Sequence, residues 1–219
     1  HKIYYHKLGT SQEEDVLFYE NPSQPRYFHT VGVTKDEKYM FLYESGQGAG
    51  STLWIKEMDA DNDNDNDNDD DNDFDTDFVQ IGFDMNYQYS PIEVIDGTLY
   101  IFTNYNAPKG KICKVDVSNP QMENWVEVIP ESDNVIASIS LADGKMIVTY
   151  DQDASHHAYV YTMDGKMLHE IALPTYGAVG FSSDYKDEEI FFAFTSFAFP
   201  TTIYKYNIND NTSEVFRTP

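Results

Sequence analysis

Two stretches of sequence decide the fold: YSPIEVIDGTLYIFTN (Tyr89–Asn104) and NVIASISLADGKMIVTY (Asn134–Tyr150). Each contains two runs rich in Val, Ile, Leu, Tyr and Thr, and an Asp-Gly pair separates the runs. Residues of these types suit pleated strands, and Asp-Gly between two such runs is typical of a β-hairpin turn. The two pairs, Asp96-Gly97 and Asp143-Gly144, lie 47 residues apart. This spacing predicts a hairpin-containing unit that recurs along the chain.

The same pattern extends over most of the 219 residues. Outside one acidic stretch, apolar and polar residues alternate with a period of two, and turn residues such as Asp164-Gly165 separate the runs. No segment of ten or more residues shows a helical period with caps. The chain is therefore predicted to be all-β. Hydrophobic residues make up 41% of it and aromatic residues 15%, which excludes a chain that is disordered throughout.

Grouping the predicted strands by fours gives a repeat of about 40–50 residues, which is the spacing of β-propeller blades. Four blades are predicted near residues 28–82, 89–129, 134–171 and 176–216, and residues 1–20 contain half a blade. A propeller closes on itself to bury its strand edges, and about four and a half blades do not complete the ring. We therefore expect residues 1–219 to form one partial β-propeller domain. The first residue, His1, is followed by no basic-then-apolar leader, so we expect a processed chain or a piece of a longer one.

Residues 59–77 read DADNDNDNDNDDDNDFDTD and hold 11 Asp, a large part of the formal net charge of −24. Like charges with few apolar side chains cannot offset the entropy of ordering, so this run is predicted to be a disordered loop. Diffuse calcium binding is the alternative, although the run contains no Gly for a calcium-binding loop. The overall negative charge argues against nucleic acid and membrane surfaces as partners.

Motifs for catalysis or for a metal are missing from the sequence. The single cysteine, Cys113, excludes an internal disulfide and a cysteine-rich zinc site. The six His form no HExxH pattern, Gly46–Thr52 lacks the Lys of a phosphate loop, and no G-x-S-x-G elbow occurs. We therefore expect no catalytic residue, metal or cofactor in the chain. One cysteine fits a cytoplasmic or a periplasmic protein, and the apolar run Ile190–Phe199 is too short to span a bilayer.

Four blocks of the sequence resemble the propeller segment of the prolyl oligopeptidases, a family of serine peptidases. They are KIYYHKLGTSQEEDVLFYE (Lys2–Glu20), TNYNAPKGKICKVDV (Thr103–Val117), WVEVIPES (Trp125–Ser132) and FFAFTSFAFPTTIYKYNI (Phe191–Ile208). The TN-x-NAP and TSF-x-x-P patterns are fairly specific to this group of peptidases, whereas the strand texture around them is generic. The order and spacing of the blocks match the family along nearly the whole chain.

In that family a seven-bladed propeller is joined to an α/β-hydrolase domain that carries the Ser, Asp and His of the catalytic triad. The resemblance implies that this chain supplies most of the outer half of the third blade and blades four to seven. The triad would then lie beyond Pro219, in the α/β-hydrolase domain of the same parent chain. The implied role is a filter that admits short proline-containing peptides to an endopeptidase that cleaves after proline. A free-standing propeller-like module that binds peptides or proteins is the alternative.

The resemblance also places two substrate contacts. One family position, usually an apolar Met-like residue, falls on Phe28. The other, often Cys, falls on Gln47 or Gly48, because a one-residue gap leaves the choice open. Packing between blades is the alternative role for Phe28.

Overall fold

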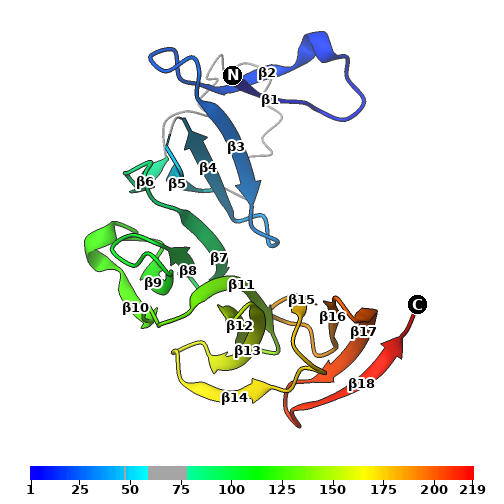
Figure 1. Cartoon of the computed structure of the whole chain (residues 1–219). Coiled ribbons are helices and arrows are strands. Elements are labelled where there is room, and N and C mark those ends of the chain that lie inside the picture. The colour runs from blue at the N-terminus through cyan, green and yellow to red at the C-terminus, as the bar shows by residue number, and fades with distance from the viewer. Residues whose placement is uncertain (47, 59–77) are drawn as a thin grey trace. The chain divides into compact units, whose positions relative to one another are not determined.

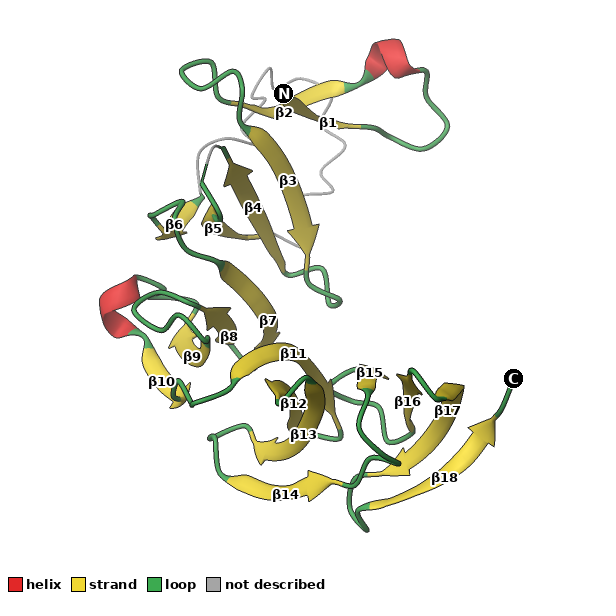
Figure 2. Ribbon diagram, viewed as in Figure 1, coloured by secondary structure: helices red, strands yellow, loops and turns green. Residues whose placement is uncertain are grey.

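The computed structural model describes residues 1–46, 48–58 and 78–219. These residues form strands joined by turns, with two short 3₁₀ helices, η1 (Gln12–Glu14) and η2 (Met122–Asn124) (Figure 2). The prediction of an all-β chain is therefore confirmed. The predicted loop at residues 59–77 lies outside the described residues. In the part of the chain that is described, no helix is long and apolar enough to cross a membrane.

The strands pair antiparallel with their neighbours in sequence and form five sheets (Figure 1). The first sheet is the hairpin of β1 (Lys2–Tyr5) and β2 (Val16–Glu20). Each of the others contains four consecutive strands: β3 (Phe28–Val33), β4 (Tyr39–Ser45), β5 (Ser51–Glu57) and β6 (Val79–Gly82); β7 (Tyr89–Ile95), β8 (Thr98–Thr103), β9 (Lys111–Asp116) and β10 (Val126–Ile129); β11 (Val135–Ala142), β12 (Lys145–Gln152), β13 (Ser155–Thr162) and β14 (Met167–Ile171); β15 (Ala178–Ser182), β16 (Ile190–Ser196), β17 (Phe199–Asn207) and β18 (Thr212–Arg217). Repeated four-stranded meanders of this kind are typical of propeller blades.

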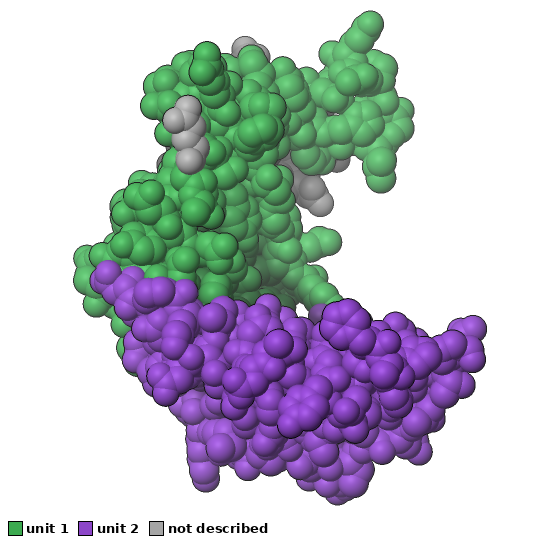
Figure 3. All heavy atoms as spheres, in the orientation of Figure 1, with its two compact units in different colours: residues 1–105, 114–126 green, residues 106–113, 127–219 purple. Residues whose placement is uncertain are grey.

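The chain divides into two compact units, residues 1–105 with 114–126 and residues 106–113 with 127–219 (Figure 3). In the second unit, a hydrophobic core joins the sheet β11–β14 to the sheet β15–β18. Ile147 and Val160 enter this core from the first of these sheets, and Phe192 and Tyr206 enter it from the second. Burial of one such side chain stabilises the fold by about 1.5–3 kcal/mol.

The burial pattern along a strand shows how many faces of its sheet are covered. In β12, every residue from Met146 to Tyr150 is buried, so both faces of this strand are covered. In β16, Phe192 and Phe194 are buried whereas Ala193, between them, is exposed. One face of β16 is therefore covered and the other is open.

Four of the described hairpins turn within two residues, and three of these turns share one backbone conformation, which explains the Asp-Gly turn signals. Asp96-Gly97 has φ values of 47° and 76°, and Asp143-Gly144 has φ values of 44° and 68°. Positive φ at both positions twists the turn to match the strands, and Gly adopts it without steric cost. Asp153-Ala154 takes the same conformation, with φ values of 50° and 60°, although Ala carries a Cβ. Ala154 is therefore strained by about 1 kcal/mol.

Replacement of Ala154 by Gly is expected to stabilise the chain, since Gly removes the Cβ that opposes a positive φ. The free energy of unfolding, measured by urea denaturation, should rise by about 0.5–1 kcal/mol. The matched control is Ala193→Gly in the exposed face of β16, where the added flexibility should lower it by a similar amount. An Ala154→Gly variant no more stable than Ala193→Gly would contradict the strain at this turn.

Backbone hydrogen bonds join successive sheets at one repeated position. The segment that enters the third strand of a sheet meets the segment that enters the first strand of the next sheet. The bonds run from the Gly50 N–H to the Met85 carbonyl (2.9 Å), from the Ile136 N–H to the Lys109 carbonyl (3.0 Å) and from the His156 N–H to the Gly177 carbonyl (2.9 Å). This recurrence shows that consecutive meanders are joined in the same way along the chain.

A polar network links β14 to the last sheet. The hydroxyl of Tyr206 donates to Oδ1 of Asn211 at 3.0 Å, so the Nε2 of His169, 3.0 Å from that hydroxyl, is the donor to it. Burial lowers the pKa of His169 below its usual value of 6.5, and the positive charge of Lys145 lowers it further. The folded chain therefore favours the neutral imidazole.

Stability is expected to fall as the pH drops below about 6.5 through the titration of His169. The unfolded chain, with the higher His pKa, binds the proton first, and this stabilises the unfolded state. Above pH 6.5 the contribution of the neutral ring is fully present. Denaturation curves at pH 8 and pH 5 should show a smaller loss of stability in His169→Gln than in the unsubstituted chain. Equal losses in both proteins would exclude His169 as a source of the pH dependence.

Candidate functional site

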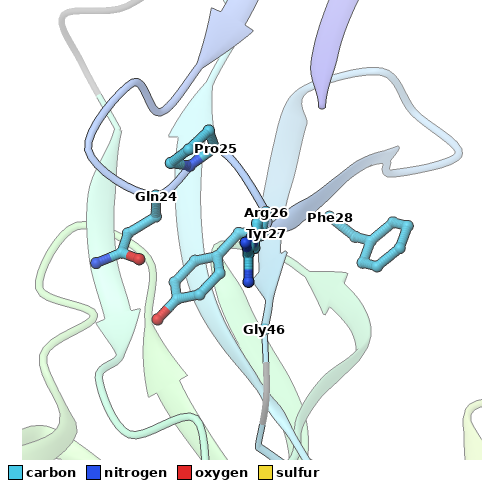
Figure 4. Close-up of a pocket in the computed structure, with 6 residues that line it drawn as sticks. All are labelled: Gln24, Pro25, Arg26, Tyr27, Phe28 and Gly46. Atoms are coloured by element: carbon cyan, nitrogen blue, oxygen red, sulfur yellow. The ribbon is translucent and has the colours of Figure 1, made fainter.

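A surface pocket of about 500 Å³ lies where the connection from β2 to β3 meets the end of β4. Five consecutive residues, 24–28, line it together with Gly46 (Figure 4). Two successive turns shape this connection, with the Gln24 N–H bonded to the Asn21 carbonyl at 3.1 Å and the Tyr27 N–H bonded to the Gln24 carbonyl at 3.0 Å. The turns place consecutive side chains around one hollow.

The sixth lining residue, Gly46, is required by the packing of an aromatic ring. A Cβ at this position would lie 2.5 Å from Cε1 of Tyr27, well inside van der Waals contact. The backbone of Gly46 thus forms the surface on which the Tyr27 ring rests. Any larger residue at this position would therefore displace the Tyr27 ring and change the shape of the pocket.

Phe28, the first residue of β3, forms an apolar wall. It pairs with Ser45 in the neighbouring strand, and its side chain remains largely exposed, at 58%. Its ring contacts the ring of His1 at a centroid distance of 4.2 Å. In Figure 4 the Phe28 ring points away from the side on which the Tyr27 ring lies, as expected for consecutive residues of an extended segment.

A buried carboxylate anchors the strands beneath the pocket. Oε1 of Glu44 accepts hydrogen bonds from the Tyr19 hydroxyl and from the Asn21 side-chain amide, both at 2.9 Å. Nε2 of the fully buried His29 lies 3.1 Å from the same oxygen. An unpaired buried charge would be costly, and the two hydrogen bonds from Tyr19 and Asn21 offset that cost. Because Tyr19 and Asn21 come from β2 and its exit, the cluster ties the β1–β2 hairpin to β3 and β4.

Of the three residues predicted from the sequence as substrate contacts, one lies in the pocket. Phe28 lines the pocket. Gly48 is not one of the lining residues, and a Cβ on it would lie 2.3 Å from the carbonyl oxygen of Met85, so it packs on another loop. Gln47 lies outside the described residues.

Five lining residues were not predicted as site residues from the sequence: Gln24, Pro25, Arg26, Tyr27 and Gly46. A signal for one of them was present, because Arg26 is one of only two arginines in a strongly acidic chain. The others carry no such signal, since the pocket arises from residues about 20 positions apart.

Elsewhere in the described residues, no group of three or more His, Cys, Asp and Glu is arranged to hold a metal ion. Cys113 is buried, and burial raises the pKa of its thiol, which disfavours the reactive thiolate.

Replacement of Gly46 by Ala is expected to displace Tyr27 and to lower the free energy of unfolding by about 1–3 kcal/mol, the usual cost of overpacking. The matched control is Gly180→Ala in β15, where a Cβ meets no atom within 4 Å and little change is expected. Urea denaturation measures both variants. If Gly46→Ala were as stable as Gly180→Ala, the close contact between Gly46 and Tyr27 would not be present in solution.

Comparison with known protein families gives one match along the whole chain. The family model described as the prolyl oligopeptidase N-terminal β-propeller domain matches residues 1–219. The fold class predicted from the sequence, a partial β-propeller of that family, is therefore confirmed.

Among curated proteins, the chain is 33% identical to a prolyl endopeptidase of Elizabethkingia meningoseptica over 100% of its own length and 29% of that protein. It is 26% identical to the dual function macrocyclase-peptidase POPB of Galerina marginata, over 93% of this chain and 27% of that protein. The chain thus spans less than a third of the length of these relatives.

Solved structures give the same result. A chain from a structural and mechanistic study of two prolyl endopeptidases superposes with a TM-score of 0.84 at 25% identity, over 98% of this chain and 30% of that one. Prolyl oligopeptidase B from Galerina marginata, solved with a 35-mer hydrolysis and macrocyclization substrate, also has a TM-score of 0.84, at 25% identity over 99% of this chain and 30% of that one.

Proposed function

Because the chain belongs to the prolyl oligopeptidase family, whose N-terminal β-propeller domain it matches from residue 1 to residue 219, we propose that it is the substrate-gating part of a serine endopeptidase. That enzyme cleaves short peptides after proline. Its Ser, Asp and His triad belongs to an α/β-hydrolase domain of the same parent protein, outside these 219 residues. The observation that carries this proposal is the full-length match to a propeller within relatives more than three times as long.

The open surfaces of the last sheet support a place within a larger protein. Every residue of β18 is exposed, including Val215 at 56% and Phe216 at 62%. Apolar side chains on an uncovered strand favour association with a further element. A free-standing module would have to leave these side chains in water.

The gating role assigns a binding surface to the propeller. Substrates reach the active site past the propeller, and residues on its surface contact the peptide on the N-terminal side of the proline. Phe28 is proposed as the apolar contact, supported by its exposed ring at the pocket. The second contact is proposed at Gln47 or Gly48, although Gly48 packs against Met85.

The purified chain is expected to show no hydrolysis of a chromogenic proline-containing peptide, because the proposed triad is not among its residues. Release of the chromophore, followed by absorbance, measures this activity, and a relative with its hydrolase domain serves as the positive control. Turnover that a serine-reactive inhibitor abolishes would contradict the proposal. A monodisperse chain that unfolds cooperatively would instead favour a free-standing binding module.

A further inference from the structure

We propose that the pocket formed by residues 24–28 and Gly46 is a subsite for a carboxylate of the bound peptide, with Arg26 as its charged donor. This inference rests on the proposed function, because it assumes that peptides pass over this surface. It goes further by naming the chemistry that the surface selects.

The positive charge of Arg26 is not neutralised by any acidic residue that the structure describes. The chain has 38 acidic residues and 14 basic ones, and several lysines are already neutralised. Lys2 pairs with Glu20 and Lys145 pairs with Asp143, both at 2.8 Å. Arg26, by contrast, forms no ion pair with any residue that the structure describes. Its guanidinium is therefore available to a carboxylate, which it can bind through two parallel hydrogen bonds.

The other walls suit the rest of an acidic side chain. In Figure 4, the Gln24 and Tyr27 side chains extend to one side, Phe28 extends to the other, and Arg26 lies between them. The amide of Gln24 and the hydroxyl of Tyr27 supply neutral hydrogen-bonding groups, whereas Pro25 and Phe28 supply apolar surface. A carboxylate on a short methylene chain can use both kinds of wall.

The pocket is held in shape before any ligand arrives. Two turns fix the segment 21–27, and the Ser23 hydroxyl also donates to Oδ1 of Asn21 at 2.6 Å. Asn21 bonds the buried Glu44, and Glu44 lies two residues before Gly46. Both sides of the pocket are therefore tied to one buried cluster, which reduces the ordering cost of binding.

The general electrostatics of the chain do not explain such a preference. A net charge of −24 repels acidic peptides at long range, and salt screens this repulsion. A preference for a carboxylate would therefore have to come from a local contact. A measured preference for a carboxylate can therefore be assigned to the pocket and not to the net charge of the chain.

The test compares two N-acetylated, C-amidated pentapeptides that contain one proline and differ only in Glu or Gln two residues before it. Binding to the 219-residue chain is measured by isothermal titration calorimetry at 0.15 M salt. The Glu peptide should bind about three- to fivefold more tightly, as expected for a partly exposed Arg–carboxylate pair. Arg26→Gln should abolish this ratio, and Arg26→Lys should restore part of it.

The matched control is Arg217→Gln, because Arg217 is the only other arginine and lies in the exposed strand β18. It changes the net charge equally and should leave the ratio unchanged. A third peptide, with Gln and a free C-terminus, distinguishes a side-chain carboxylate from a terminal one. If it is this peptide that loses affinity in Arg26→Gln, the pocket binds the chain terminus.

The outcomes separate this inference from the proposed function. Phe28→Ala should weaken the Glu and Gln peptides alike. If it does so while Arg26→Gln leaves every ratio unchanged, the carboxylate subsite is overturned and the gating surface stands. If none of the peptides binds the chain, both are overturned.

Discussion

The structure depends on one constraint: a sheet whose two faces are apolar needs a partner on each face. The central strand β12 is buried without interruption from Met146 to Tyr150, which is possible only where both faces are covered. A single sheet of this composition would expose about half of these side chains to water, at about 1.5–3 kcal/mol for each large one. Stacked four-stranded meanders meet the constraint, and the core between β11–β14 and β15–β18 shows how.

Stacking on faces leaves the backbone edges to be satisfied separately, and the chain does this with a repeated device. The entry to each third strand bonds the entry to the next first strand, as Gly50 does with Met85 and His156 with Gly177. Close approach of two backbones leaves no room for side chains. A Cβ on Gly50 would lie 1.7 Å from the carbonyl oxygen of Tyr87, which accounts for a Gly at this position.

The shape of the surface pocket depends on hydrogen bonds to a buried carboxylate. Glu44 is a charged residue within a strand, and its burial would destabilise the fold without donors from β2 and its exit. Once those donors are in place, the same contacts fix the connection that carries Arg26 and Phe28. The apolar wall of Phe28 and the guanidinium of Arg26, which pairs with no acidic residue in the described part of the chain, are therefore both positioned by one anchored loop.

The sequence by itself determined the all-β class, the hairpins at Asp96-Gly97 and Asp143-Gly144, and the family. These follow from local features, because side-chain alternation and turn chemistry are set by residues within a few positions of one another. The family blocks are likewise contiguous in sequence. The two 3₁₀ helices were not predicted, since three residues are too few to show a period.

Apart from Phe28, which the family resemblance had already indicated, only the tertiary structure decided the candidate site. A strand pattern treats Glu44 as a solvent-facing charge, whereas its partners Tyr19 and Asn21 are more than 20 residues away in sequence. The pocket likewise forms only where residues 24–28 contact Gly46. Neither segment has a sequence pattern that predicts this contact. The burial of a side chain and the meeting of two segments both depend on contacts between distant parts of the chain. A local sequence pattern does not predict such contacts.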